Sequence, residues 1–142
     1  MSLDTAPAAS PRPSARIMIV EDDPGDVYLL EKALRSRQIS YELTCFEDGE
    51  DAIHGLDAGL VPDLILVDLN MPRRDGVDVL RAIRSRPALV GVPVGVFTSS
   101  EAPSDRSRIS LIGTGRYIHK PLELSEFLSE VGQAVEELLA RG

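Results

Sequence analysis

The chain has 142 residues, one cysteine and a formal net charge of -8 at pH 7, which suits a single domain that folds without a disulfide or a structural metal. The lone Cys45 excludes an internal disulfide and favours a reducing, cytoplasmic location. No apolar run reaches the ~18 residues of a membrane span, and the acidic balance disfavours nucleic acid as a partner.

The chain divides into a leader and one folded domain. Residues 1–15 are small and rich in proline, with no apolar periodicity, so we expect a disordered leader. Residues 16–142 form the predicted domain, which ends in a long helix. The leader has no basic start followed by an apolar segment, and it therefore differs from a secretory signal.

Five short apolar runs alternate with segments of helical periodicity. The predicted strands cover residues 17–20, 41–46, 64–67, 94–97 and 117–118. The predicted helices have apolar faces marked by Val27, Leu30 and Leu34; by Ala52, Ile53 and Leu56; by Val79, Leu80 and Ile83; by Ile109 and Ile112 within 104–112; and, after Pro121, by Leu124, Phe127, Leu128, Val131, Val135, Leu138 and Leu139. This alternation predicts an α/β fold of (βα)5 type with a parallel sheet.

Asp68 ends the run of residues 64–67, four consecutive large apolar residues that predict a strand buried on both faces of a parallel sheet. The breaker pairs Met71-Pro72 and Asp75-Gly76 follow, so the chain leaves the sheet directly after this carboxylate. Ligands and chemistry collect at the carboxyl edge of open α/β sheets. Taken alone, this stretch leaves two interpretations open, a loop cap and a reactive carboxylate.

Three acids, Glu21, Asp22 and Asp23, follow the first predicted strand. Such a turn is the opposite of the glycine-rich turn that cradles phosphates. If the first and third strands are neighbours, Glu21 and Asp22 meet Asp68, and charges about 4 Å apart at a dielectric near 20 repel by roughly 4 kcal/mol. Such a cluster favours a bound Mg²⁺. A solvated loop that favours the start of a helix is the alternative.

The last two strands add a hydroxyl and an ammonium group at the same edge. Thr98 follows the fourth apolar run, and Lys120 follows the fifth. Together with the acids, these groups can hold a divalent cation and a phosphoryl group. Asp68 can then serve as the nucleophile.

Four features stand in a fixed order, each at the end of a predicted strand: Glu21-Asp22, Asp68, Thr98 and Lys120-Pro121. In that order they resemble the acidic pair, the phosphoacceptor, the switch hydroxyl and the lysine of the receiver domain of two-component response regulators. The resemblance covers about residues 16–140. It implies a flavodoxin-like three-layer sandwich whose sheet has the order 2-1-3-4-5. That order comes from the family, not from the residues.

The resemblance implies that Asp68 accepts a phosphoryl group from a sensor histidine kinase. Mg²⁺ would be held by Asp22, by Asp68 and by the backbone carbonyl of Asn70, with Glu21 acting through water. The chain would catalyse only its own phosphorylation and dephosphorylation, and it would otherwise be no enzyme.

Further roles follow from the same resemblance. Lys120 would bridge to the phosphoryl oxygens, Thr98 would move inward to donate to one of them, and Tyr117 would follow. The small Ser99 leaves room for the phosphoryl group, and Ser100, with Asn70, flanks the attacking water. The surface made by the fourth helix, fifth strand and fifth helix would carry the output.

Residues 20–26, 68–76 and 98–100 look like those of the single-domain regulators paired with bacterial and cyanobacterial phytochromes. This similarity implies a light-sensing kinase as the partner. Only 21 residues follow Pro121, which is enough for one helix and no effector domain. We therefore expect signalling by docking.

The last helix carries an apolar seam with steps of four and three residues. The seam consists of Leu124, Leu128, Val131, Val135 and Leu138. Most of it should pack on the sheet, but Val135, Leu138 and Leu139 are expected to pass the sheet edge. We predict a homodimer through that exposed end.

Two other functions remain open. An aspartyl phosphatase needs a general acid two residues after its nucleophile, and this chain has Asn70 there. A binding module that is never phosphorylated is the second, although Thr98 and Lys120 argue against it.

The remaining candidates receive structural interpretations. We expect His54 on the surface, His119 in packing, Cys45 in the core, and Arg73 and Arg74 in a solvated loop.

Overall fold

The five strands form one parallel sheet in the order β2-β1-β3-β4-β5. The computed structural model describes residues 14–69, 76–98 and 116–141. Its strands are β1 (Ala15–Val20), β2 (Tyr41–Phe46), β3 (Leu64–Asp68), β4 (Val94–Thr98) and β5 (Arg116–His119). This order confirms the predicted topology and places β3 between β1 and β4.

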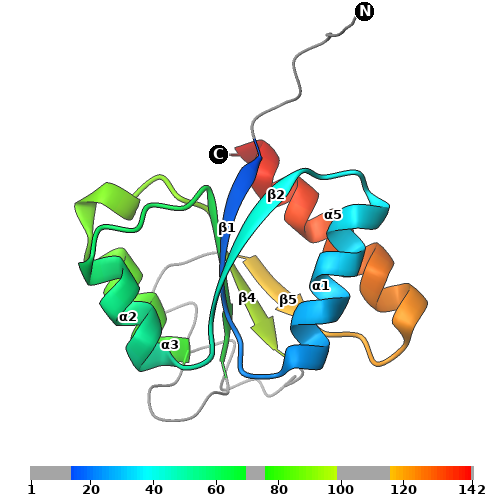
Figure 1. Ribbon diagram of the computed structural model, residues 1–142, viewed down its shortest axis with the longest axis horizontal. Coiled ribbons are helices and arrows are strands. Elements are labelled where there is room, and N and C mark those ends of the chain that lie inside the picture. Colours follow the sequence, from blue (N-terminus) through cyan, green and yellow to red (C-terminus); the bar gives the residue numbers. More distant parts are fainter. Residues whose placement is uncertain (1–13, 70–75, 99–115, 142) are drawn as a thin grey trace, which may run out of the picture.

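Helices cover both faces of the sheet, so the fold has three layers (Figure 1). The helices are α1 (Pro24–Ser36), α2 (Gly49–Asp57), α3 (Gly76–Arg84) and α5 (Leu124–Arg141), with a short 3-10 helix η1 (Pro87–Leu89). The pair α1 and α5 lies on one side of the strands, and α2 and α3 lie on the other. The helix expected over residues 104–112 lies outside the described residues.

The central strands are buried on both faces, because alternate side chains face opposite layers. Met18 and Ile65 belong to the apolar cluster beneath α2 and α3. Ile17 and Leu66 belong to the cluster beneath α1 and α5. All five residues of β3 are buried, as the apolar run predicted. Asp68 therefore stands at the end of the most enclosed strand.

Side-chain caps begin two helices at the edge of the sheet where Asp68 lies. Asp23 caps α1, since its Oδ1 accepts a hydrogen bond of 2.8 Å from the backbone of Gly25, and Pro24 follows at the start of the helix. Asp48 caps α2 in the same way through the backbone of Asp51, at 2.9 Å. These caps bring helix N-termini, with their partial positive charge, to the polar edge.

The amino-terminal boundary lies slightly earlier than predicted. Ala15 already belongs to β1, and the Ser14 hydroxyl forms a hydrogen bond of 2.8 Å with that of Ser40. The expected leader therefore extends two residues too far. Ala15 joins the sheet because it pairs with Tyr41 of β2. The pattern of apolar residues does not reveal this backbone pairing.

The expectation that Cys45 lies in the core is wrong, because this residue is exposed. Cys45 sits on the edge strand β2, beside a hollow of about 220 Å³ that Val27 and Tyr28 of α1 also line. A strand at the edge of the sheet has a neighbouring strand on one side only, and the hollow beside it leaves Cys45 open to solvent. His54 is exposed on α2, as predicted.

The expected overhang of α5 is also wrong. Val135 and Leu138 are buried in the core, and Leu139 packs against the same cluster. Leu138 lies over Gly95 of β4, where an added Cβ would stand 3.1 Å from its Cδ1. The missing side chain on β4 lets α5 stay on the sheet, so the buried Val135 and Leu138 cannot supply the apolar surface of a homodimer.

Among residues 14–69, 76–98 and 116–141, no helix combines the length and the apolar character required to cross a membrane.

Candidate functional site

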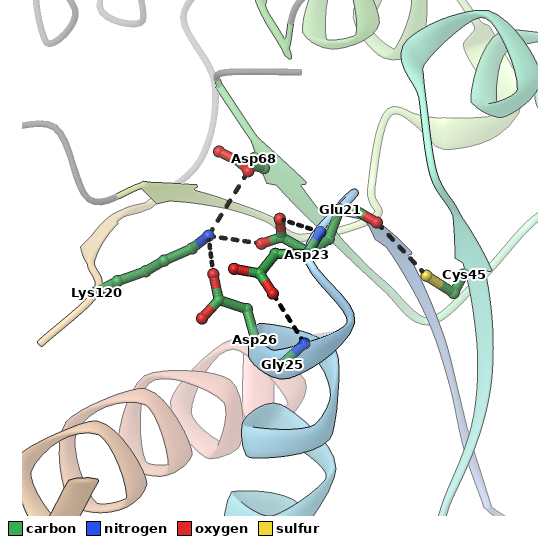
Figure 2. A network of polar contacts seen from close by, with 7 residues as sticks. All are labelled: Glu21, Asp23, Gly25, Asp26, Cys45, Asp68 and Lys120. Atoms are coloured by element: carbon green, nitrogen blue, oxygen red, sulfur yellow. Dashed lines mark hydrogen bonds and ion pairs between the residues drawn. The ribbon is translucent and has the colours of Figure 1, made fainter. Parts of the chain in front are cut away.

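Three charged side chains from separate strands meet at the carboxyl edge of the sheet. Glu21 follows β1, Asp68 ends β3 and Lys120 follows β5. They are 1%, 6% and 8% exposed, respectively. Figure 2 shows the lysine side chain extending toward both acids. Charged groups are rarely this buried without partners, so the three form one interacting unit.

Lys120 is shared unequally among three carboxylates. Its Nζ lies 2.6 Å from Glu21 Oε1 and 2.7 Å from Asp26 Oδ2, both of which accept hydrogen bonds. Asp68 Oδ2 is 3.6 Å away, which is ion-pair distance but longer than a good hydrogen bond. The same nitrogen lies 4.9 Å from the centre of the Phe97 ring. The ammonium thus sits closer to β1 and α1 than to Asp68.

The pKa values of the two most buried groups reflect this crowding. Burial by itself lowers the pKa of Lys120, but the hydrogen bonds to Asp26 and Glu21 and the charge of Asp68 outweigh burial and raise it. The pKa of Glu21 is raised to about 8, first by burial and then by the nearby Asp68, while Lys120 opposes the rise. The lysine therefore stays charged, whereas additional positive charge, such as a bound cation, would stabilise the ionised form of the crowded acids.

The acids have the geometry of a cation site. Glu21, Asp22 and Asp68 each offer one carboxylate oxygen, and these atoms lie within 4.8 Å of one another. Asp22 is exposed, so the cluster is open to solvent on one side. Hard oxygen donors with room for water suit a divalent cation such as Mg²⁺ or Mn²⁺. The residues present therefore fit the metal that the sequence predicts.

The neighbouring acids of the turn have different tasks. The backbone N–H of Asp23 donates to Glu21 Oε2 at 3.2 Å, while the side chain of Asp23 caps α1. The thiol of Cys45 donates weakly to the backbone carbonyl of Glu21 at 3.8 Å. The turn therefore combines two arrangements, because Asp23 begins the helix while Glu21 and Asp22 join the acidic cluster.

The structure places the remaining predicted site residues with less detail. The backbone of Thr98 ends β4, and Tyr117 is half-buried in β5 against the core beneath α2 and α3. Asn70, Ser99 and Ser100 lie outside the described residues, as do Arg73 and Arg74.

Asp26 is the site residue that the sequence analysis missed. It lies in the first turn of α1 and binds Lys120 as closely as Glu21 does. A carboxylate in the first turn of a helix is ordinarily explained by its favourable interaction with the helix dipole. This explanation by itself provides no reason to assign Asp26 a further interaction. The available indication was that a buried lysine needs more than one acceptor, and that α1 begins at the same edge.

Comparison with known proteins decides the family. Residues 17–132 match the family described as the response regulator receiver domain. The chain belongs to this family. The receiver is 32% identical over 130 residues to response regulator Rcp1 of Synechocystis sp., covering 87% of this chain and 88% of that protein. It spans only 24% of response regulator PleD of Caulobacter vibrioides, at 34% identity over 78% of this chain.

A solved structure of the phosphorylated cyanobacterial phytochrome response regulator RcpA shares the fold. Its TM-score is 0.84 at 32% identity, over 92% of this receiver and 97% of that chain. The Mn²⁺-bound form of Rcp1 has a TM-score of 0.76 at 31% identity, over 84% and 90% of the two chains. These matches confirm the predicted family and the flavodoxin-like fold. Receiver domains accept phosphoryl groups from histidine kinases and act in signalling.

Proposed function

We propose that Asp68 is the phosphoacceptor of this receiver and that its phosphorylation by a sensor histidine kinase requires Mg²⁺. One observation carries the proposal. The buried carboxylate of Asp68, at the end of the central strand, belongs to a cluster of three acids whose oxygens lie within 4.8 Å of one another. The same carboxylate lies 3.6 Å from the ammonium nitrogen of Lys120. This combination supplies a nucleophile together with positive charge for a phosphoryl group.

The transfer needs no proton from Asp68. A carboxylate oxygen attacks the phosphorus of a phosphohistidine, the P–O bond forms as the P–N bond breaks, and the electron pair returns to the imidazole nitrogen. Lys120 offsets the charge on the phosphoryl oxygens. Glu21, Asp22 and Asp68 would hold the cation, which neutralises charge on the transferring group when it is bound.

Hydrolysis restores the resting state. Water attacks the phosphorus, the P–O bond to Asp68 breaks, and inorganic phosphate leaves. We assign Ser99 to the space beside the phosphoryl group, and Asn70 and Ser100 to the path of that water. Thr98 and Tyr117 carry the change to the surface formed by the fourth helix, β5 and α5. The chain thus acts catalytically only on its own phosphorylation state.

The partner we propose is a phytochrome kinase in the cytoplasm. The support is the similarity to Rcp1 and RcpA, the second of which is described as a phytochrome response regulator. Residues 1–13 serve as a leader in this proposal. A homodimer stays part of the proposal, but its interface has to use residues other than the buried Val135 and Leu138.

The test is intact-protein mass spectrometry after incubation with acetyl phosphate and Mg²⁺. We expect one phosphoryl adduct that hydroxylamine removes and that Asp68→Asn and EDTA each abolish. Absence of any adduct in the wild-type protein would favour a binding module. Steady turnover of p-nitrophenyl phosphate would instead favour a phosphatase. The purified phytochrome kinase, with and without light, then tests the partner.

A further inference from the structure

We infer that Asp26 is a positioning residue that holds the Lys120 ammonium toward α1 in the unphosphorylated protein and thereby opposes the phosphorylated state. The inference rests on the proposed function, because it concerns the same phosphoacceptor. It begins from the unequal sharing of one nitrogen, which lies 2.7 Å from Asp26 Oδ2 and 3.6 Å from Asp68 Oδ2.

The donors of Lys120 are limited. An ammonium group has three N–H bonds and no acceptor. Two donate to Glu21 and Asp26 at short range, which leaves one directed donor for any group on Asp68. A phosphoryl group on Asp68 adds three acceptor oxygens and negative charge beside the same ammonium. Closer engagement of these oxygens therefore competes with the bond to Asp26.

The two carboxylates that hold Lys120 differ in what else they do. Glu21 belongs to the three-acid cluster and also accepts from the backbone of Asp23. Asp26 is not among the residues of that cluster, and its bond to Lys120 joins α1 to the end of β5 (Figure 2). Asp26 can therefore be changed without removing a ligand of the proposed cation.

Charge works in the same direction as hydrogen bonding. Asp26 and Asp68 contact the same nitrogen, so their carboxylates lie near each other. The Asp26 side chain is about a quarter exposed, at 23%, so its charge is only partly screened. Its negative charge disfavours a phosphoryl group on Asp68. Asp26→Asn removes that charge, preserves the side-chain shape and weakens the hold on Lys120.

The experiment measures an equilibrium affinity for a phosphoryl analogue. Beryllofluoride, which coordinates a carboxylate as a phosphoryl group does, is titrated at saturating Mg²⁺ and followed by fluorine NMR. We expect the Asp26→Asn variant to bind beryllofluoride at least about threefold more tightly than the wild-type protein. This factor corresponds to the interaction free energy of one partly exposed charge pair. Affinity for Mg²⁺ alone, measured by calorimetry, should stay equal or weaken.

Two controls separate positioning from general effects. Glu130→Gln removes the same charge from the exposed face of α5 and should leave the affinity unchanged. In a Lys120→Gln background, the effect of Asp26→Asn should fall by about half or more, because interacting residues are not additive. A merely structural role for Asp26 would lower the melting temperature and leave the ratio of beryllofluoride to Mg²⁺ affinity unchanged.

The outcomes are distinct. Tighter binding of beryllofluoride by Asp26→Asn, with an effect at least halved in the Lys120→Gln background, supports the inference. An undiminished effect in that background overturns it. Equal or weaker binding overturns it, while phosphorylation of the wild-type protein at Asp68 leaves the proposed function intact. A wild-type protein that accepts neither acetyl phosphate nor beryllofluoride overturns both.

Discussion

Gly76 and Asp68 are in such close contact that only glycine fits at the start of α3. A Cβ at Gly76 would stand 2.3 Å from the carbonyl oxygen of Asp68 and 2.7 Å from the Cα of Leu69. The backbone N–H of Gly76 also donates to the Leu69 carbonyl at 3.0 Å. The first residue of α3 thus lies against the end of β3 and restricts the backbone that carries the proposed phosphoacceptor, Asp68.

Gly76→Ala tests this contact. Alanine favours helices over glycine by about 1 kcal/mol, but relief of the clash requires backbone movement, and overpacking costs about 1–3 kcal/mol. We expect a net loss in the free energy of unfolding, measured with urea, and slower phosphorylation by acetyl phosphate. Gly91→Ala is the matched control, since a Cβ there meets nothing within 4 Å. Equal stability of the two variants would contradict the interpretation.

The sequence predicted the strands, the parallel sheet and the polar residues at the strand ends because each depends on a local pattern, whereas the order of the strands came from the family resemblance. The apolar run before Asp68 predicted a buried strand, and the carboxyl ends of three parallel strands carry Glu21, Asp68 and Lys120 at one edge of the sheet. The sharing of Lys120 with Asp26 depends on where the first turn of α1 lies relative to the end of β5, which periodicity does not specify. The course of α5 depends on Gly95, whose missing side chain acts on Leu138 from another element.

Lys120 should stabilise the fold as well as the phosphoryl group. Its removal leaves Glu21 and Asp68 as buried acids without their cation, and breaking a buried pair costs about 3–5 kcal/mol. We expect Lys120→Gln to lose stability in urea unfolding with EDTA, and to regain more than the wild-type protein does when Mg²⁺ is added. If Mg²⁺ increased the free energy of unfolding of both proteins equally, Glu21 and Asp68 would not depend on Lys120 for charge compensation.

Asp22 should contribute to metal binding more than to stability, because it is the exposed member of the cluster. At a hundred times its dissociation constant, Mg²⁺ stabilises the folded state by about 2.7 kcal/mol. We expect Asp22→Asn to weaken Mg²⁺ binding, measured by calorimetry, by about tenfold, which corresponds to the free energy of one hydrogen bond to a charged group. In EDTA, its free energy of unfolding should equal that of the wild-type protein. Glu130→Gln is the control. Unchanged affinity in Asp22→Asn would remove this residue from the site.

Leu138 should behave as a core residue of the monomer. It is 2% exposed, whereas Leu122, in the turn between β5 and α5, is 99% exposed. Leu138→Ala is expected to reduce the free energy of unfolding by about 2–5 kcal/mol, while Leu122→Ala should change it by less than about 0.5 kcal/mol. Urea unfolding measures both values, and sedimentation velocity of the folded proteins measures association. If Leu138→Ala kept full stability and only shifted sedimentation toward a smaller species, Leu138 would belong to an interface between copies and its burial against Gly95 would be wrong.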